Sequence, residues 1–334
     1  MTKRPLFGDF GHRMLVGAFT PDPAEMQVDR PLFGLNLQTT WLYGFFRDET
    51  GRAYSTERKF VGSLSSGLFL MSGQDGDFTV SRESGRSARG ELRRVIGDEE
   101  RRWYDPVFQR LPQGTVREDE QTCELTFTGA RLTYSEGDLL NLDGPSTGLG
   151  LQYFSGSRDN PLLYTASSYW MTGEILGRRV EGPIFYDNAY WRHGLDWKGY
   201  GYYNDLQIVW LHFCNKYEDG TFQFDHLISG RDSFSPGIVI ENNEVAAMTP
   251  ATSATFKVDE EGWPLRGEYD VAGTAYEFTG DPSGFMRQFS ASRWNGYRVQ
   301  CGEVRRVGDH RKMTSGFTWA ESFGDRLADS GLIQ

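Results

Sequence analysis

Short segments that alternate between apolar and polar residues recur along the whole chain, with Gly, Asp, Asn or Ser between them. In GLNLQTTWLYGFFRD, which surrounds Trp41, every second residue falls on the same side of an extended chain. This period of two is typical of half-buried β-strands joined by tight turns. Aromatic residues make up 14% of the chain and 40 residues are glycine, which also favours strands over helices. We therefore predict an all-β fold of antiparallel strands, with short helices only at Gly90 to Arg102 and in the C-terminal FGDRLADSGLIQ.

Both halves of the chain are equally rich in such segments. A chain of 334 residues is long enough for two domains, each with its own core. The segment DNPLLYTASSYW, near residues 159–170, is the expected join. The predicted organisation is an N-terminal β domain of residues 1–165 packed against a C-terminal β domain of residues 166–334.

Charge and composition exclude several classes of partner. The formal net charge is -11 and the sequence pI is about 5.1, so nucleic acids and anionic membrane surfaces would be repelled. No run of about eighteen apolar residues occurs, and the N-terminal MTKRPLFGDFGHRM lacks the apolar segment of a secretory signal. We expect a cytoplasmic protein that does not insert stably into membranes. Whether it forms a homodimer is left open by the sequence.

Sequence motifs that bind metals or nucleotide cofactors are missing from the chain. Cys123, Cys214 and Cys301 are far apart and form no CxxC pair, so neither structural disulfides nor a zinc site is expected. There is no GxSxG, P-loop or HExxH, and no GxGxxG at a strand-to-helix junction. What remains is acid and base chemistry by carboxylate, histidine or tyrosine, with no metal or other cofactor.

The stretch from Gly173 to Gly230 gathers aromatic rings, histidines and carboxylates. It indicates either a very aromatic core or a pocket for an apolar ligand, and the pocket is favoured. Within it, EGPIFYDNAYWRHGLDW fits neither a helix stripe nor a clean strand, so we expect a strand that enters an irregular loop. Six residues are expected to converge on that loop: Asp187, Asn188, Tyr190, Trp191, His193 and Asp196. Alternatively, Asp187 and Asn188 only cap a turn.

Asp219 and Gly220, between two alternating runs, give the strongest hairpin signal in the chain. A two-residue loop there would point His212 and His226 to opposite faces of the sheet. One face would carry Trp210, His212 and Asp225 and make the better cavity wall. His212 is alternatively a solvent-facing residue, and His226 is read as a residue of the core or rim.

At this segment the chain resembles the carotenoid 1,2-hydratase and AttH-like proteins, a superfamily with two lipocalin-like barrels. The likeness rests on GEILGRRVEG, YDNAYWRHGLDW, QIVWLHFCNKYEDGTF and EEGWPLRGEYDV, whose order and spacing agree over residues 173–275. Asn188 stands where the family usually has histidine, and Trp191 lies one place later, so a catalytic role transfers only to Asp187. The resemblance implies two packed lipocalin-like barrels, a large apolar cavity and cofactor-free chemistry on isoprenoid or polyketide-like molecules.

From these observations we predict a hydratase or dehydratase that acts on an apolar terpenoid or related alkene or alcohol. Burial beside aromatic rings would raise the pKa of Asp187 and make it a usable acid. Ring faces would stabilise the carbocation, and His193 or His212 would orient or deprotonate water. The alternatives are a pericyclase or isomerase that folds a polyene, and a non-catalytic carrier of an apolar metabolite.

The candidate residues follow from this hypothesis. The predicted catalytic residues are Asp187, His193, His212 and Tyr190, and the predicted substrate-binding residues are Trp41, Tyr186, Asn188, Trp191, Trp210 and Asp225. The N-terminal residues to examine first are Asn36, Gln38, Trp41 and Tyr43.

Overall fold

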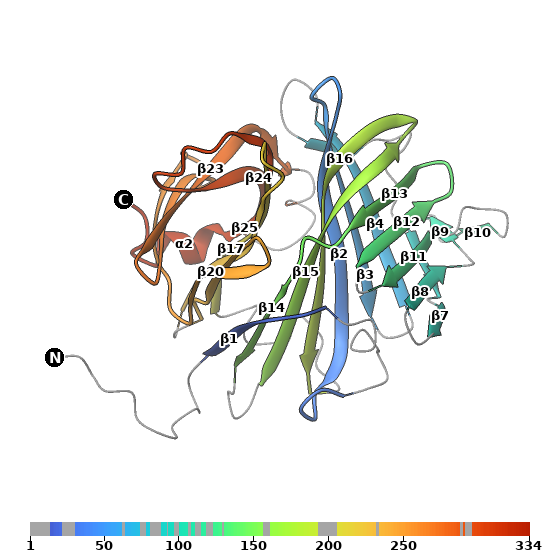
Figure 1. Ribbon diagram of the computed structural model, residues 1–334, viewed down its shortest axis with the longest axis horizontal. Helices are drawn as coiled ribbons and strands as arrows, with labels where there is room; N and C mark the ends of the chain where they lie inside the picture. Colours follow the sequence, from blue (N-terminus) through green and yellow to red (C-terminus); the bar gives the residue numbers. More distant parts are fainter. Residues whose placement is uncertain are drawn as a thin grey trace.

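The computed structural model describes residues 14–21, 31–61, 64–73, 78–80, 88–91, 93–96, 100–105, 108–110, 115–117, 123–128, 130–155, 161–192, 206–231, 234–287, 290 and 296–334. Most of these residues lie in antiparallel strands, which form two curled sheets that pack side by side (Figure 1). The prediction of an all-β fold with few helices is confirmed. No helix in the described part of the chain is long and apolar enough to cross a membrane.

The first sheet contains sixteen strands among the described residues, in the order β10-β9-β6-β4-β3-β2-β16-β15-β13-β12-β11-β8-β7, with β1, β5 and β14 attached to its sides. The strands are β1 (Met14–Phe19), β2 (Asn36–Asp48), β3 (Ala53–Val61), β4 (Leu64–Gly73), β5 (Phe78–Val80), β6 (Ala88–Glu91), β7 (Arg93–Ile96), β8 (Glu100–Asp105), β9 (Phe108–Arg110), β10 (Thr115–Arg117), β11 (Cys123–Thr128), β12 (Arg131–Glu136), β13 (Leu140–Pro145), β14 (Gly150–Ser155), β15 (Leu162–Ile175) and β16 (Arg178–Trp191). The helix predicted from Gly90 to Arg102 is wrong, because the described residues there belong to β6, β7 and β8.

The second sheet has nine strands, in the order β20-β19-β18-β17-β25-β24-β23-β22-β21. They are β17 (Gln207–Tyr217), β18 (Phe222–Gly230), β19 (Gly237–Glu241), β20 (Glu244–Thr249), β21 (Ser253–Val258), β22 (Pro264–Val271), β23 (Thr274–Phe285), β24 (Tyr297–Arg306) and β25 (Met313–Phe323). The short helix α2 (Gly324–Ala328) follows, within the predicted C-terminal helix. The boundary expected between residues 165 and 166 lies within β15, and the chain passes between the sheets after Trp191 and before Gln207.

Strand β15 divides the first sheet into two branches. Its first residues, Leu162 to Ala166, pair with β14, whereas Thr172 to Ile175 pair with β13. The β14 branch, with β1 on its edge, therefore turns toward the second sheet and contacts β18, β19 and β20 (Figure 1). Strands β15 and β16 thus lie at the junction of the two sheets.

The two faces of the central strands have different neighbours, because side chains alternate along each strand. One face of β2, β15 and β16 packs into the core of the first sheet with residues such as Phe127 and Tyr169. The other face packs against the outer side of β17, β18, β24 and β25 through a layer of aromatic rings that includes Tyr43, Phe185 and Trp319. This aromatic layer joins the two sheets.

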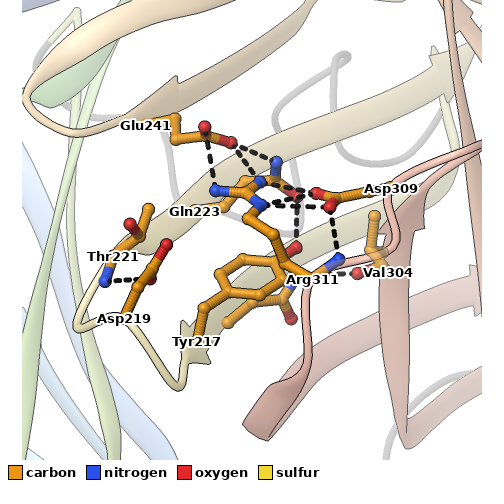
Figure 2. Close-up of polar contacts among 9 residues, drawn as sticks. Tyr217, Asp219, Thr221, Gln223, Glu241, Val304, Asp309 and Arg311 are labelled. Atoms are coloured by element: carbon orange, nitrogen blue, oxygen red, sulfur yellow. Dashed lines mark hydrogen bonds and ion pairs between the residues drawn. The ribbon is translucent and has the colours of Figure 1, made fainter.

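The hairpin between β17 and β18 has a three-residue loop. Tyr217 pairs with Thr221, with its N–H 2.9 Å from the Thr221 carbonyl oxygen, and Gly220 takes a φ of +84°. The guanidinium of Arg311 lies 4.1 Å from the Tyr217 ring centre and forms two hydrogen bonds with Glu241, of 3.0 and 2.8 Å, beside Asp309 (Figure 2). These contacts fix the end of the hairpin.

The loop length decides which way the histidines point. With three residues in the loop, His212 lies directly opposite His226, and Asp225 lies opposite Phe213. The prediction that the two histidines face opposite sides of the sheet is therefore wrong. Both lie on the face that packs against the first sheet, because directly paired residues share a face.

Candidate active site between the two sheets

Asp187 is the centre of a polar cluster enclosed by the aromatic layer. It lies in β16, directly opposite Ala166 of β15 and Trp41 of β2, and only 2% of it is exposed. Tyr164 and Tyr43 lie two positions away on these flanking strands and therefore on the same face. Both tyrosine hydroxyls donate a hydrogen bond to Oδ2 of Asp187.

The two oxygens of the Asp187 carboxyl differ in their surroundings. Oδ2 accepts both tyrosine hydrogen bonds, whereas Oδ1 is buried and accepts none. The Nδ1 atom of His212 lies 3.5 Å from Oδ1. Burial raises the pKa of Asp187 to about 7, although the hydrogen bonds from Tyr164 and Tyr43 lower it, and the negative charge of Glu321 adds to the rise. The proton of the neutral acid belongs on Oδ1, since both lone pairs of Oδ2 are already used.

His212 supports this arrangement from the second sheet. Its Nδ1 lies 2.9 Å from the Tyr43 hydroxyl, and its Nε2 lies 3.3 Å from the Ser168 hydroxyl. Because Tyr43 donates its proton to Asp187, its oxygen accepts the hydrogen bond from Nδ1–H of His212. The ring stacks on Phe185 at 3.9 Å, and burial lowers the pKa of His212 well below its usual value. His212 is therefore a neutral residue with partners at both nitrogens.

His226 lies beside His212, with ring centres 3.8 Å apart and planes tilted by 33°. Its Nδ1 is 2.7 Å from Oδ1 of Asp225, whereas its Nε2 is buried and has no hydrogen-bond partner. Burial lowers the pKa of His226, and burial together with the nearby Asp187 raises the pKa of Asp225. Both groups are therefore favoured in their neutral forms.

Aromatic rings surround the polar atoms. Trp210 presents an edge contact to Tyr164 and another to His226, each with ring centres 5.0 Å apart. Tyr153 stacks on Tyr164 at 4.9 Å with planes only 8° apart. Tyr43 packs on Trp319 at 4.8 Å. The carboxyl is thus enclosed by the aromatic layer.

An apolar groove of about 400 Å³ lies over β1 and β14, on the face of the sheet away from this cluster. Its walls include Leu15, Phe33, Phe154, Leu163 and Tyr153. Phe33 is 83% exposed, so the groove opens to solvent beside a large apolar side chain. Leu15, Phe154 and Leu163 share the face of the sheet that carries Tyr190, so the groove and the Asp187 carboxyl lie on opposite sides of the sheet.

Several predicted site residues meet in this cluster. Asp187, His212, Trp210 and Asp225 lie at its centre, and Trp41 and Trp191 belong to the same aromatic layer. His193 and Asp196 lie outside the described residues. Tyr43, one of the four N-terminal residues to examine first, contributes directly through its hydrogen bond to Asp187.

The predicted convergence on an irregular loop is wrong for Asn188 and Tyr190, whereas the residues after Arg192 and before Leu206 lie outside the described part of the chain. The segment up to Trp191 is a continuous strand, β16, so neighbouring side chains point to opposite faces. Tyr186 packs into the core of the first sheet, Asn188 accepts a 2.7 Å hydrogen bond from Thr40, and Tyr190 packs with Leu163. These three residues lie on the face of β16 away from Asp187.

The sequence did not identify Tyr164 as a site residue, and it placed His226 only in the core or rim. A loop of three residues that ends in glycine is a common hairpin connection, and with that register the two histidines are direct partners. That signal was available in the sequence. Tyr164 carried no comparable signal, because its contact with Asp187 depends on which strand pairs with β16.

The polar atoms of the cluster are close enough together to bind one small ligand. A carboxylate oxygen of Asp187 and one ring nitrogen each of His212 and His226 lie within 4.8 Å of one another. A divalent cation or a single water oxygen can span such a distance. Both nitrogens of His212 already have hydrogen-bond partners, and the donors to Asp187 are tyrosine hydroxyls. These hydrogen bonds favour a bound oxygen atom that exchanges a proton with the cluster over a divalent cation.

The fold and the cluster together define the class of this chain. It is an all-β protein of two packed antiparallel sheets, with a buried centre of two aspartates, two tyrosines and two histidines where the sheets meet.

No family model matches the sequence, and no curated protein matches it. Among solved structures, the chain is similar to a putative AttH from Nitrosomonas europaea, with 10% identity, a TM-score of 0.39 and coverage of 86% of this chain and 93% of that chain. It is similar to CghA solved with Sch210972, with 11% identity, a TM-score of 0.45 and coverage of 86% and 89%. It is also similar to kievitone hydratase from Nectria haematococca, with 8% identity, a TM-score of 0.39 and coverage of 91% and 94%. The first of these bears the AttH name that the sequence resemblance also gave.

Proposed function

We propose that this protein is a cofactor-independent hydratase or dehydratase that adds water to, or removes it from, an apolar terpenoid-like alkene or alcohol. The observation that carries the proposal is the Asp187 carboxyl, buried between two sheets with one oxygen held by two tyrosines and the other without a partner. A carboxyl with a pKa of about 7 is half protonated near neutrality, which suits a general acid.

In the hydration direction, Asp187 gives its Oδ1 proton to one alkene carbon. Positive charge then develops on the other carbon. Tyr164 binds the carboxyl and Trp210 packs on Tyr164, and a ring face stabilises a nearby cation by roughly 0.5–2 kcal/mol. Tyr43 and Tyr164 stabilise the carboxylate that remains, because both donate to Oδ2.

The surroundings of the acid support an apolar substrate. Apolar rings of the aromatic layer surround the polar atoms around Asp187, which is itself 2% exposed. Because the carboxyl is enclosed by side chains, a substrate must displace a ring to reach it.

The test is incorporation of oxygen from labelled water. Purified protein is incubated with candidate terpenoid alkenes and alcohols in H₂¹⁸O, and the products are analysed by mass spectrometry for wild type, Asp187→Asn and the exposed control Asp325→Asn. Label in the product of wild type and control, with a loss of about a hundredfold or more in Asp187→Asn, supports the proposal.

Two results would overturn it. A rearranged or cyclised product without label identifies an isomerase or pericyclase. Binding of the terpenoid with no product identifies a carrier.

A further inference from the structure

Asp225 has an unusual backbone conformation for its place in the fold. Its φ is +113°, a region that L-amino acids rarely adopt. The other described non-glycine residues with positive φ lie in turns, whereas Asp225 lies inside β18. Strained backbone of this kind is retained where the rest of the structure enforces it, and it is concentrated at functional sites.

The strained backbone brings two consecutive side chains together. In a regular strand, Asp225 and His226 would point to opposite faces of the sheet. Here the Asp225 carboxyl lies 2.7 Å from Nδ1 of His226, and both residues are buried. The hydrogen bond fixes the orientation of the imidazole and leaves Nε2 as its outward atom.

Two buried polar atoms without partners then belong to the same cluster. Nε2 of His226 comes from the second sheet, and Oδ1 of Asp187 comes from the first. The two residues offer donor or acceptor atoms within 4.8 Å of each other. We take these atoms to be Nε2 of His226 and Oδ1 of Asp187, because both lack a hydrogen-bond partner, and one oxygen atom placed between such a pair reaches both at hydrogen-bond distance.

We propose that His226 is a catalytic residue that holds the reacting oxygen, which is water in hydration and the substrate hydroxyl in dehydration, and that Asp225 is its positioning residue. This inference rests on the proposed function and names the part of the site that handles the oxygen.

The proton balance closes with a single carboxyl. The Oδ1–H of Asp187 is transferred to one alkene carbon as the π electrons form the new C–H bond. The oxygen held by His226 then forms the C–O bond to the cationic carbon, and its surplus proton returns to the Asp187 carboxylate. The acid is regenerated, and both the proton and the hydroxyl reach the alkene from the side of this cluster.

The hydrogen bond with Asp225 also decides which nitrogen of His226 carries the proton. Because burial favours the neutral form of both groups, the Asp225 hydroxyl donates to Nδ1, and Nε2 carries the hydrogen. Nε2–H is then a donor to the bound oxygen, while Asp187 exchanges the proton.

The first test needs no substrate. The chain has five histidines, so ¹⁵N-histidine labelling gives a simple spectrum in which long-range ¹H–¹⁵N correlations identify each tautomer. The signal of His226 is assigned by its loss in His226→Phe, which keeps the ring stacking. Wild type is expected to show the Nε2–H tautomer, and Asp225→Asn, whose amide can also donate to Nδ1, is expected to retain it. A wild-type Nδ1–H tautomer overturns the inference.

The second test uses the labelled-water assay. His226→Phe is expected to lower kcat by about a hundredfold. Asp225→Ala is expected to lower it by about tenfold, whereas Asp225→Asn keeps most of it. If wild type incorporates label and His226→Phe does so at the same rate, His226 does not hold the oxygen and the hydratase proposal survives. If wild type gives neither a labelled alcohol from an alkene nor an alkene from an alcohol, the proposed function itself fails.

Discussion

The Asp187 carboxyl shows how one residue can be costly for stability and useful for chemistry. Its pKa in the folded protein is about 7, whereas an exposed aspartate has a pKa near 3.8. The folded state therefore binds a proton that the unfolded state releases between these two values. Unfolding becomes easier as the pH rises through this window, because the ionised acid is disfavoured in the buried site.

Replacing Asp187 with asparagine removes this pH dependence. Asparagine keeps an oxygen for the two tyrosine hydroxyls and carries no charge. We expect the melting temperature of wild type, relative to Asp187→Asn, to fall as the pH rises from about 4 to 7. Thermal denaturation followed by circular dichroism across this range measures the difference. Parallel melting curves at every pH would contradict a raised pKa at this residue.

The two tyrosines control the same pKa in the opposite direction from burial. Their hydrogen bonds favour the ionised form, so Tyr43→Phe or Tyr164→Phe should raise the pKa of Asp187 further. A hydrogen bond to a charged group contributes about 1.5–3 kcal/mol, which corresponds to a shift of about one to two pH units. The alkaline limit of the hydration rate should move up by that amount in a pH profile. Tyr169→Phe is the matched control, because its buried hydroxyl has no partner and its side chain lies in the core of the first sheet.

For the secondary-structure elements, the sequence was sufficient to predict which segments form strands. It was insufficient to predict the register in which neighbouring strands pair. Alternation predicted strands such as β2 and β17, since that pattern depends only on neighbouring residues. The face that each histidine occupies depends on one loop residue, because a shift of one position moves every side chain of β18 to the other side. Residues in β16 were assigned to a loop because both faces of this strand are buried, so its sequence does not alternate. Contacts between distant strands, such as Tyr164 with Asp187, leave no local pattern at all.

The end of the β17–β18 hairpin is held by a charged clamp that can be tested by itself. Arg311 binds Glu241 and Asp309, and its side chain lowers the pKa of Asp309 to about 2 (Figure 2). Arg311→Met should lower the free energy of unfolding by about 1–3 kcal/mol at neutral pH. Because the pKa of Asp309 is depressed, this contribution is complete above about pH 4 and is lost as the pH falls toward 2. Urea unfolding at both pH values measures it.

A matched control lies next to the clamp. Lys312 pairs with Glu218 at 2.6 Å, but its side chain is 73% exposed. Lys312→Met should change the free energy of unfolding by less than about 1 kcal/mol, because exposed ion pairs contribute little. An equal effect of the two substitutions would mean that the clamp gains nothing from its partial burial.

For the whole molecule, the site exists only while the two sheets stay together. Asp187, Tyr43 and Tyr164 come from the first sheet, and the two histidines come from the second. A small displacement of one sheet would separate the acid from the nitrogens that face it. The strength of the interface between the sheets is therefore part of the chemistry.

That interface contains both rings and ion pairs, and the rings should dominate its stability. Trp319 is 3% exposed and packs on Tyr43 and Phe45 across the interface, whereas the ion pair of Arg47 with Asp281 is partly open to solvent. Trp319→Ala should lower the free energy of unfolding by about 3–5 kcal/mol, and Arg47→Met by less than about 1 kcal/mol. Urea unfolding at low and high salt separates the two contributions, since salt screens only the ion pair. If high salt destabilised wild type as much as loss of the tryptophan, charges rather than the aromatic layer would hold the acid against the histidines.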